Sequence, residues 1–341
     1  MKTCSSILII LLLFAAGCNK KDTGSGQTIT PITLEMPAGW PSPRYDFTNN
    51  PLTVEGFDLG KKLFYDGRLS KDGNFPCASC HQQFAAFSTF DHDFSHGFNN
   101  QFTTRNAPPL FNLAWHKEFH WDGGINHIEV QPLGPITAVN EMAETIDNVV
   151  AKVGADAEYR RMFQKAFGDE TVTSQKMMKA LALFMNAMVS YNSRYDRMKR
   201  GETSFSSAEQ RGYDLFRANC SSCHMEPLFT DLSYRNNGLN ENPGIGDKGR
   251  MRITGSPSDS LKFKVPSLRN ILLTFPYMHD GRLKTPMQVL NHYTSGIEQS
   301  ATLDPLLKNG ISLSDMDKLY LLEFFKTLTD STFIKDKRFA Q

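Results

Sequence analysis

The sequence Cys-Ala-Ser-Cys-His occupies residues 77–81, and Cys-Ser-Ser-Cys-His occupies residues 220–224. Two thiols on one turn can add to the two vinyl groups of one haem, and the histidine that follows then reaches the iron. Zinc is the competing interpretation of Cys-x-x-Cys, but a zinc site does not require histidine directly after the second cysteine. The motifs therefore predict two covalently bound haem c groups. Their attaching and proximal residues are Cys77, Cys80, His81, Cys220, Cys223 and His224.

Of the six cysteines, only Cys4 and Cys18 lie outside these motifs. Residues 1–18 combine an early lysine, a short apolar run and small residues that lead into Cys18, which is the pattern of a lipoprotein signal peptide. An ordinary signal peptide and a membrane anchor are the alternatives, although a spanning helix needs roughly 18 to 20 apolar residues. We therefore expect a periplasmic protein that is lipidated at Cys18 and held to the membrane by that lipid only.

The overall charge is nearly balanced, with 37 basic and 36 acidic side chains. A nucleic-acid-binding surface normally requires an excess of basic residues, so no nucleic-acid partner is expected. Residues 19–50 are rich in Lys, Thr, Gly, Ser and Pro and lack apolar periodicity, which predicts a flexible tether. Helical signals dominate beyond it. Thr173 or Ser174 can cap one helix, and Ser206 with Glu209 forms a capping box for another.

The two haem motifs belong to two similar halves of the chain. Each half has Gly-x-x-Leu-Phe upstream of its motif, at residues 60–64 and 212–216. One constant offset also pairs Pro108 with Pro266, Leu110 with Leu268, Asn112 with Asn270, Asp122 with Asp280 and Gly123 with Gly281. We therefore predict a mainly α fold of two cytochrome c-like haem domains related by internal duplication. Their expected bounds are residues 51–203 and 204–341.

The halves differ where a haem would have its second axial position. The first half has Trp121 where the second has His279, and it also offers an amide and a carboxylate downstream, Gln131 and Glu141. An open haem iron beside a carboxylate can cleave the O–O bond of peroxide, because the carboxylate moves a proton from one oxygen to the other. The alternative is that Glu141 is only an acidic residue in the first turn of a helix.

An ordered series of short segments extends these features along the chain. They are Leu-Phe-Tyr-Asp at 63–66, Arg-Asn-Ala-Pro at 105–108, Trp-Asp-Gly at 121–123, Pro-Ile at 135–136, Glu-Met at 141–142 and Pro-Tyr-Met-His-Asp-Gly at 276–281. With the two haem motifs, this series resembles the bacterial di-haem cytochrome c peroxidase and MauG family, over about residues 54–327. The resemblance implies a peroxidatic first haem with Gln131 and Glu141 on its distal side. It also implies that Trp121 lies between the haems and helps electrons to pass, with simple packing as the alternative.

The resemblance further implies that the second haem is the electron-entry centre. Its sixth ligand would be Tyr293, as in MauG-like members, where the peroxidases have methionine; Met278 is the alternative ligand. A tyrosine oxygen stabilises ferric iron and lowers the potential. A calcium ion would be held by the Asn106 side chain and the carbonyls of Thr274 and Pro276. In the loop after the first motif, His96 is the better candidate for a distal ligand of the resting first haem, and His92 is also in range.

These features favour a di-haem peroxidase that reduces hydrogen peroxide to water. Electrons would come from a periplasmic donor protein such as a small cytochrome c or a cupredoxin. Tyr293 supports a second hypothesis, a MauG-like oxidase that uses peroxide-derived high-valent haem on another substrate. A non-catalytic di-haem electron carrier is the third hypothesis, but such a carrier has no need of an amide and a carboxylate beside one haem only.

Overall fold

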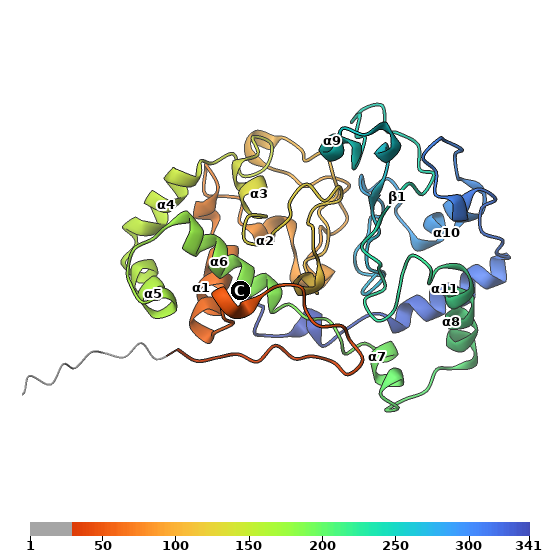
Figure 1. Cartoon of the computed structure of the whole chain (residues 1–341), viewed down its shortest axis with the longest axis horizontal. Coiled ribbons are helices and arrows are strands. Elements are labelled where there is room, and N and C mark those ends of the chain that lie inside the picture. The colour runs from red at the N-terminus through yellow and green to blue at the C-terminus, as the bar shows by residue number, and fades with distance from the viewer. Residues whose placement is uncertain (1–28) are drawn as a thin grey trace, which may run out of the picture.

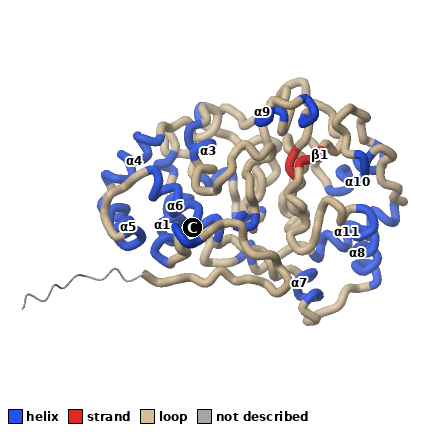
Figure 2. Tube along the Cα trace, in the orientation of Figure 1, coloured by secondary structure: helices blue, strands red, loops and turns tan. Residues whose placement is uncertain are grey.

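The computed structural model describes residues 29–341 (Figure 1). The expected signal peptide, the lipidation candidate Cys18 and the first part of the expected tether lie outside the described residues. The described chain is mainly helical, and its only sheet pairs two short antiparallel strands, β1 (Tyr234–Arg235) and β2 (Phe263–Lys264) (Figure 2). Long loops connect the helices. The prediction of a mainly α fold is confirmed.

The helices fall into two groups that follow the order of the chain (Figure 1). The first group is α1 (Val54–Phe64), α2 (Cys77–Cys80), α3 (Leu133–Thr137), α4 (Ile146–Ala155), α5 (Ala157–Phe167) and α6 (Ser174–Asn186). The second group is α7 (Arg194–Lys199), α8 (Ser207–Asn219), α9 (Met251–Thr254), α10 (Pro286–Ser295) and α11 (Asp315–Thr327). Short 3₁₀ turns fill the loops at Phe47–Asn49, Gly67–Leu69, Gln83–Ala85, Phe98–Asn100, Leu113–Trp115, Pro257–Asp259, Pro305–Leu307 and Phe333–Lys335.

The two helix starts that the sequence predicts are present. Thr173 caps α6, because its hydroxyl accepts the backbone N–H of Lys176. Ser206 and Glu209 form the expected capping box of α8, in which each side chain binds the backbone N–H of the other residue. Helix α8 ends at Asn219, so the second haem motif begins directly at the helix C-terminus.

Each helix group has its own hydrophobic core, and the border between them differs from the expected one. Tyr195 of α7 is fully buried among Phe216, Phe229 and Phe324 of the second core. The second unit therefore begins before residue 204, and the capping box at Ser206 marks the start of a helix rather than of a domain. The C-terminal tail crosses back, since Phe333 and Phe339 are buried in the first core.

The internal duplication is visible in the backbone as well as in the sequence. An isolated β-bridge joins Phe119 to Ile125 in the first half, and an equivalent bridge joins Tyr277 to Leu283 in the second. Left-handed backbone conformations recur at the same repeat positions. These are Asn112 and Asn270 (φ 57° and 56°), His120 and Met278 (φ 64° and 72°), and Gly123 and Gly281 (φ 69° and 68°).

The glycine of each Gly-x-x-Leu-Phe segment lets two helices approach closely. Gly60 of α1 lies against the backbone carbonyl of Ala180 in α6, and Gly212 of α8 lies against the carbonyl of Tyr320 in α11. A Cβ atom at either position would overlap that carbonyl oxygen. The repeated glycine therefore fixes the same helix pair in both halves, and this pair carries the segment that leads to each haem motif.

Gly212→Ala is expected to lower the free energy of unfolding by about 1–3 kcal/mol, because the added methyl group must push two packed helices apart. Gly154→Ala is the matched control. Gly154 is also helical, but a Cβ there would only make ordinary contact with Val172 at 3.7 Å, so alanine should be neutral or stabilising by up to about 1 kcal/mol. Thermal unfolding of both holoproteins checks this. Equal unfolding temperatures would contradict the close-packing argument.

Residues 30–50 are not a free tether, which corrects the sequence-based expectation for the described part of that segment. The backbone N–H of Ile32 donates to Leu52, and those of Arg44 and Tyr45 both donate to Ala114. Trp40 packs edge-on against buried Trp115, with ring centroids 5.1 Å apart, and the guanidinium of Arg269 lies over its other side. These aromatic anchors hold the segment across both cores, although the surrounding composition is that of a linker.

Candidate functional site

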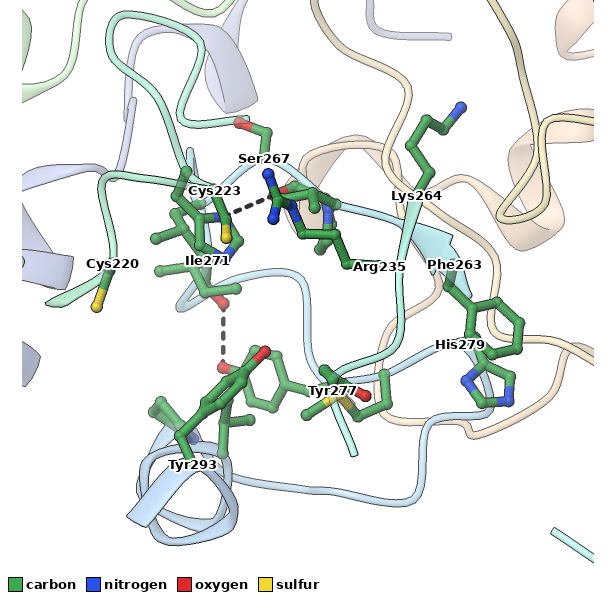
Figure 3. Close-up of a pocket in the computed structure, with 18 of the residues that line it drawn as sticks. Cys220, Cys223, Arg235, Phe263, Lys264, Ser267, Ile271, Tyr277, His279 and Tyr293 are labelled. Carbon is green, nitrogen blue, oxygen red and sulfur yellow. Dashed lines mark hydrogen bonds between the residues drawn. The ribbon is translucent and has the colours of Figure 1, made fainter. Parts of the chain in front are cut away.

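A cavity in the second half is lined by the two cysteines and the histidine of the second haem motif, Cys220, Cys223 and His224. Figure 3 shows this cavity with both cysteines labelled. Tyr293 projects into it from α10, and Phe263 of β2 and His279 close another side, with their rings stacked 3.7 Å apart. The rest of the wall is largely aliphatic and includes Val265, Leu268, Ile271, Val289 and Leu290. An apolar slot with two thiols and a histidine at its edge fits a haem.

The two motif histidines are held in the form that a metal requires. The Nδ1 atom of His81 is 2.9 Å from the carbonyl of Phe87, and Nδ1 of His224 is 3.2 Å from Phe229 and 3.1 Å from Pro266. Donation from Nδ1 leaves the Nε2 lone pair free, which is the usual arrangement of a metal-ligating histidine. Burial also lowers the pKa of His81 to about 4 and lowers that of His224, which favours the neutral ring in both.

Two candidate sixth ligands for the second haem, Tyr293 and Met278, line the same cavity. The amide of Asn237 donates to the Met278 sulfur at 3.3 Å. Burial raises the pKa of the Tyr293 hydroxyl, and a hydrogen bond from Asn237 opposes that rise. Both candidate ligands therefore hydrogen-bond the side-chain amide of Asn237.

In the first half, Glu141 lies in a turn between α3 and α4 rather than in a helix. Helix α4 begins later and is capped by Thr145, while Glu144 pairs with Lys152. The helical interpretation of Glu141 is therefore wrong. Burial raises the pKa of the Glu141 carboxyl. Burial also raises the pKa of the Cys80 thiol, and the Glu141 carboxylate adds to that rise because it lies close to the first haem motif.

Gln131 has a neighbour that the sequence did not single out. Nε2 of His120 is 3.3 Å from Nε2 of the Gln131 amide. His120 is largely enclosed, and its pKa is lowered by burial. The only sequence signal was its place directly before Trp121, at the repeat position that Met278 occupies in the second half.

Trp121 lies at the border of the two halves. Its side chain lines the second cavity, and its indole N–H donates to the carbonyl of Asn106 at 2.8 Å. Its own carbonyl accepts the backbone N–H of Lys264 in β2 at 2.7 Å. Both halves therefore fix this tryptophan, as an electron pathway between them would require.

Buried ion pairs join the halves beside Trp121. Arg105 donates to Asp122 at 2.7 Å and to Asp247 at 2.6 Å, and both carboxylates are almost fully buried. Arg250 reaches the carbonyls of Asp122 and Gly123 from the second half. Removing one partner of such a cluster leaves a buried charge uncompensated, which makes the relative position of the halves costly to change.

The three candidate calcium residues line the same cavity as Trp121. The Asn106 amide nitrogen donates to the carbonyls of His92 and Asp93, at 3.1 and 3.2 Å, so its oxygen is directed elsewhere. That oxygen and the carbonyls of Thr274 and Pro276 are ligands of the kind that a hard cation prefers. Among residues 29–341, no cluster of three or more His, Cys, Asp or Glu side chains could hold a metal ion.

The loop that carries His96 lies beside the first haem motif, because Ser95 hydrogen-bonds the Cys80 thiol and the backbone N–H of Phe98 donates to the carbonyl of Glu141. The His96 side chain is exposed, and its ring packs against Phe102 with centroids 4.5 Å apart and against His92 at 5.5 Å. The loop that carries both histidines is also tied to the Asn106 side chain.

Comparison with known proteins identifies the class. Residues 54–204 match the model of the di-haem cytochrome c peroxidase family. The chain is 37% identical to the methylamine utilization protein MauG of Methylorubrum extorquens, over 82% of this chain and 79% of that protein. It is 33% identical to the cytochrome c551 peroxidase of Nitrosomonas europaea, over 89% of this chain and 91% of that protein.

A solved structure agrees with this class. The crystal structure of a MauG-like protein associated with microbial copper homeostasis superposes with a TM-score of 0.83 and 35% identity, covering 91% of this chain and 99% of that one. The protein is therefore a di-haem oxidoreductase of the peroxidase type. The chain belongs to the di-haem cytochrome c peroxidase and MauG family.

Proposed function

We propose that the first haem reduces hydrogen peroxide and that electrons reach it from the second haem past Trp121. Both haems would be attached covalently, through Cys77 and Cys80 and through Cys220 and Cys223. The observation that carries this proposal is the asymmetry of the halves. Within residues 29–341 the largely enclosed Glu141 carboxylate has no ion-pair partner and lies near the first motif, whereas the second cavity holds Tyr293 as a candidate ligand.

Glu141 and Gln131 have different roles in the proposed reaction of the first haem. The haem, when bound through His81, supplies the electrons and an open coordination position for peroxide. Glu141 accepts the proton from the nearer peroxide oxygen and delivers it to the farther one, which then leaves as water. The Gln131 amide holds the peroxide or a water by hydrogen bonds. Burial raises the proton affinity of Glu141 and so suits it to this shuttle.

The choice between a peroxidase and a MauG-like oxidase depends on Tyr293. A tyrosine oxygen that bound the iron of the second haem would favour its oxidised states, which supports oxidation of a second substrate. Relatives of both kinds share about a third of their residues with this chain. We therefore keep peroxide reduction with a small cytochrome c or cupredoxin as the main function and the MauG-like oxidase as the second.

Spectra and turnover of the holoprotein test the proposed function. We expect one five-coordinate, high-spin haem that reacts with hydrogen peroxide, and oxidation of reduced cytochrome c when both are present. The non-catalytic carrier predicts two six-coordinate, low-spin haems that never react with peroxide. That result would rule out both enzymatic functions.

A calcium ion at Asn106, Thr274 and Pro276 is the second part of the proposal. The backbone carbonyl of Asn106 also accepts a hydrogen bond from the Trp121 indole N–H. Loss of the ion from Asn106 should therefore disturb the electron pathway past Trp121 more than it disturbs the peroxide site. Prolonged treatment with EGTA is expected to slow electron transfer between the haems, and added calcium should restore it. Metal analysis of the untreated protein that finds no calcium would contradict the proposal.

Cytochrome c peroxidases of this family are generally periplasmic. Among residues 29–341, no helix is both long enough and apolar enough to cross a membrane. We propose that Cys18 carries a lipid that attaches the protein to a membrane facing the periplasm. Cells that express the protein should incorporate labelled palmitate into it, and Cys18→Ser should abolish this labelling. Labelling that persists in Cys18→Ser would contradict the proposal.

A further inference from the structure

His120 and Met278 occupy the same place in the two halves of the duplicated fold. Each follows the first residue of an equivalent β-bridge, and each has a left-handed backbone conformation, with φ of 64° and 72°. Such a conformation is uncommon for residues other than glycine. Its recurrence at one repeat position means that the backbone directs both side chains in the same way relative to their own haem unit.

In the second half, the structure shows which cavity the side chain at this repeat position lines. Met278 lines the haem cavity together with Tyr293, and its sulfur accepts a hydrogen bond from the Asn237 amide at 3.3 Å. In the first half, His120 also meets a side-chain amide, that of Gln131, at 3.3 Å. The repeat therefore directs His120 toward Gln131, which the proposed function places on the distal side of the first haem.

We propose that His120 is the distal histidine of the first haem unit and that it positions the Gln131 amide. This rests on the proposed function, in which the first haem binds peroxide. His120 acts through Gln131 and is a positioning residue rather than a proton donor to peroxide.

The surroundings of His120 fit this role. The neutral ring can accept an N–H of the Gln131 amide at Nε2, and burial favours the neutral form by lowering the pKa of His120. Asp122 raises that pKa, whereas Lys264 and Arg105 lower it. The ring also packs on α3, since a Cβ at Gly134 would be 3.2 Å from its Cε1 atom. These contacts restrict the orientation of the imidazole ring. Its hydrogen bond with Gln131 in turn favours one orientation of the Gln131 amide.

Carbon monoxide bound to the reduced first haem is a suitable probe, because its stretching frequency reports hydrogen bonding on the distal side without any turnover. We expect His120→Phe, which removes the acceptor but keeps an aromatic ring, to shift this frequency. Cyanide affinity of the oxidised protein should fall by up to about tenfold, the value of one lost hydrogen bond. His120→Gln keeps an acceptor oxygen and should restore most of both properties.

His127→Phe is the matched control, because His127 is exposed and its Nδ1 accepts the backbone N–H of Glu129. An unchanged spectrum of the second haem in each variant shows that the fold is retained. Equal shifts in His120→Phe and His120→Gln, or none in either, would overturn the proposal. Failure of the proposed function is separate, since it would appear as normal peroxide turnover in Glu141→Gln while the carbon monoxide shift persisted.

Discussion

Replacing Glu141 with glutamine is expected to slow the reaction of the holoprotein with hydrogen peroxide by roughly 10²–10⁴-fold, the usual range for loss of a general acid–base group. Glutamine has nearly the same shape but cannot accept and return a proton. Glu141 lies in a turn whose position is fixed by backbone hydrogen bonds, including that from its own N–H to the carbonyl of Ala138. The substitution should therefore leave the fold and both haems in place. Stopped-flow spectra after mixing with peroxide measure the rate.

The pH dependence of the same reaction provides an independent check. Burial raises the pKa of Glu141 above its ordinary value of 4.5, so its ionised, proton-accepting form is lost at a higher pH than for an exposed glutamate. The wild-type rate should rise as the pH increases through this raised pKa. The slow residual reaction of Glu141→Gln should lack that rise. A rise at the same pH in both proteins would assign the titration to another group.

Glu144→Gln is the matched control for Glu141→Gln. Glu144 is also buried, but its carboxylate pairs with Lys152 and accepts the N–H of Thr145, and these interactions lower its pKa to about 2. Its replacement should lower stability and leave the peroxide rate within about twofold, because a structural ion pair does not act on the substrate. If both variants lost the same fraction of activity, the effect of Glu141→Gln would be structural rather than catalytic.

Local rules in the sequence predicted a large part of this fold. The caps at Thr173 and Ser206 depend only on neighbouring backbone N–H groups, so the sequence contains all the information they need. The duplication was also visible in the sequence, because each half needs a glycine, Gly60 or Gly212, where two helices pack too closely for a Cβ atom. The placement of Phe333 and Phe339 in the first core depends on the tertiary path of the tail, and no local pattern indicates it.

The candidate site shows the same division. Gln131 and Glu141 stood out because a carboxylate and an amide are present in only one half. His120 did not, since a lone histidine beside a tryptophan has many ordinary explanations. Its meaning appears only when the left-handed backbone and the contact with Gln131 are known. The packing of Trp40 on Trp115 was hidden for a similar reason, because two aromatic residues far apart in the sequence carry no sign of their contact.

Tyr293→Met is expected to raise the reduction potential of the second haem by on the order of 100 mV or more, because axial ligands set much of the potential of a haem and methionine favours the reduced iron. Tyr293 is enclosed in the cavity, so its oxygen has little water to compete with a metal. A spectroscopic redox titration measures the change. Turnover of peroxide with reduced cytochrome c should survive this substitution, whereas oxidation of another substrate by stored oxidising equivalents should not.

Two further variants separate Tyr293 from its neighbours. Tyr277→Phe removes a hydroxyl from the same cavity, but that hydroxyl donates to the carbonyl of Ile271 at 3.0 Å, so the potential should stay near that of the wild type. Met278→Leu removes the alternative ligand and leaves Tyr293 in place. A large change of the second-haem spectrum in Met278→Leu, with none in Tyr293→Met, would assign the sixth ligand to Met278. The halves would then differ less than we propose, and the argument for a MauG-like activity, which depends on the tyrosine oxygen, would be lost.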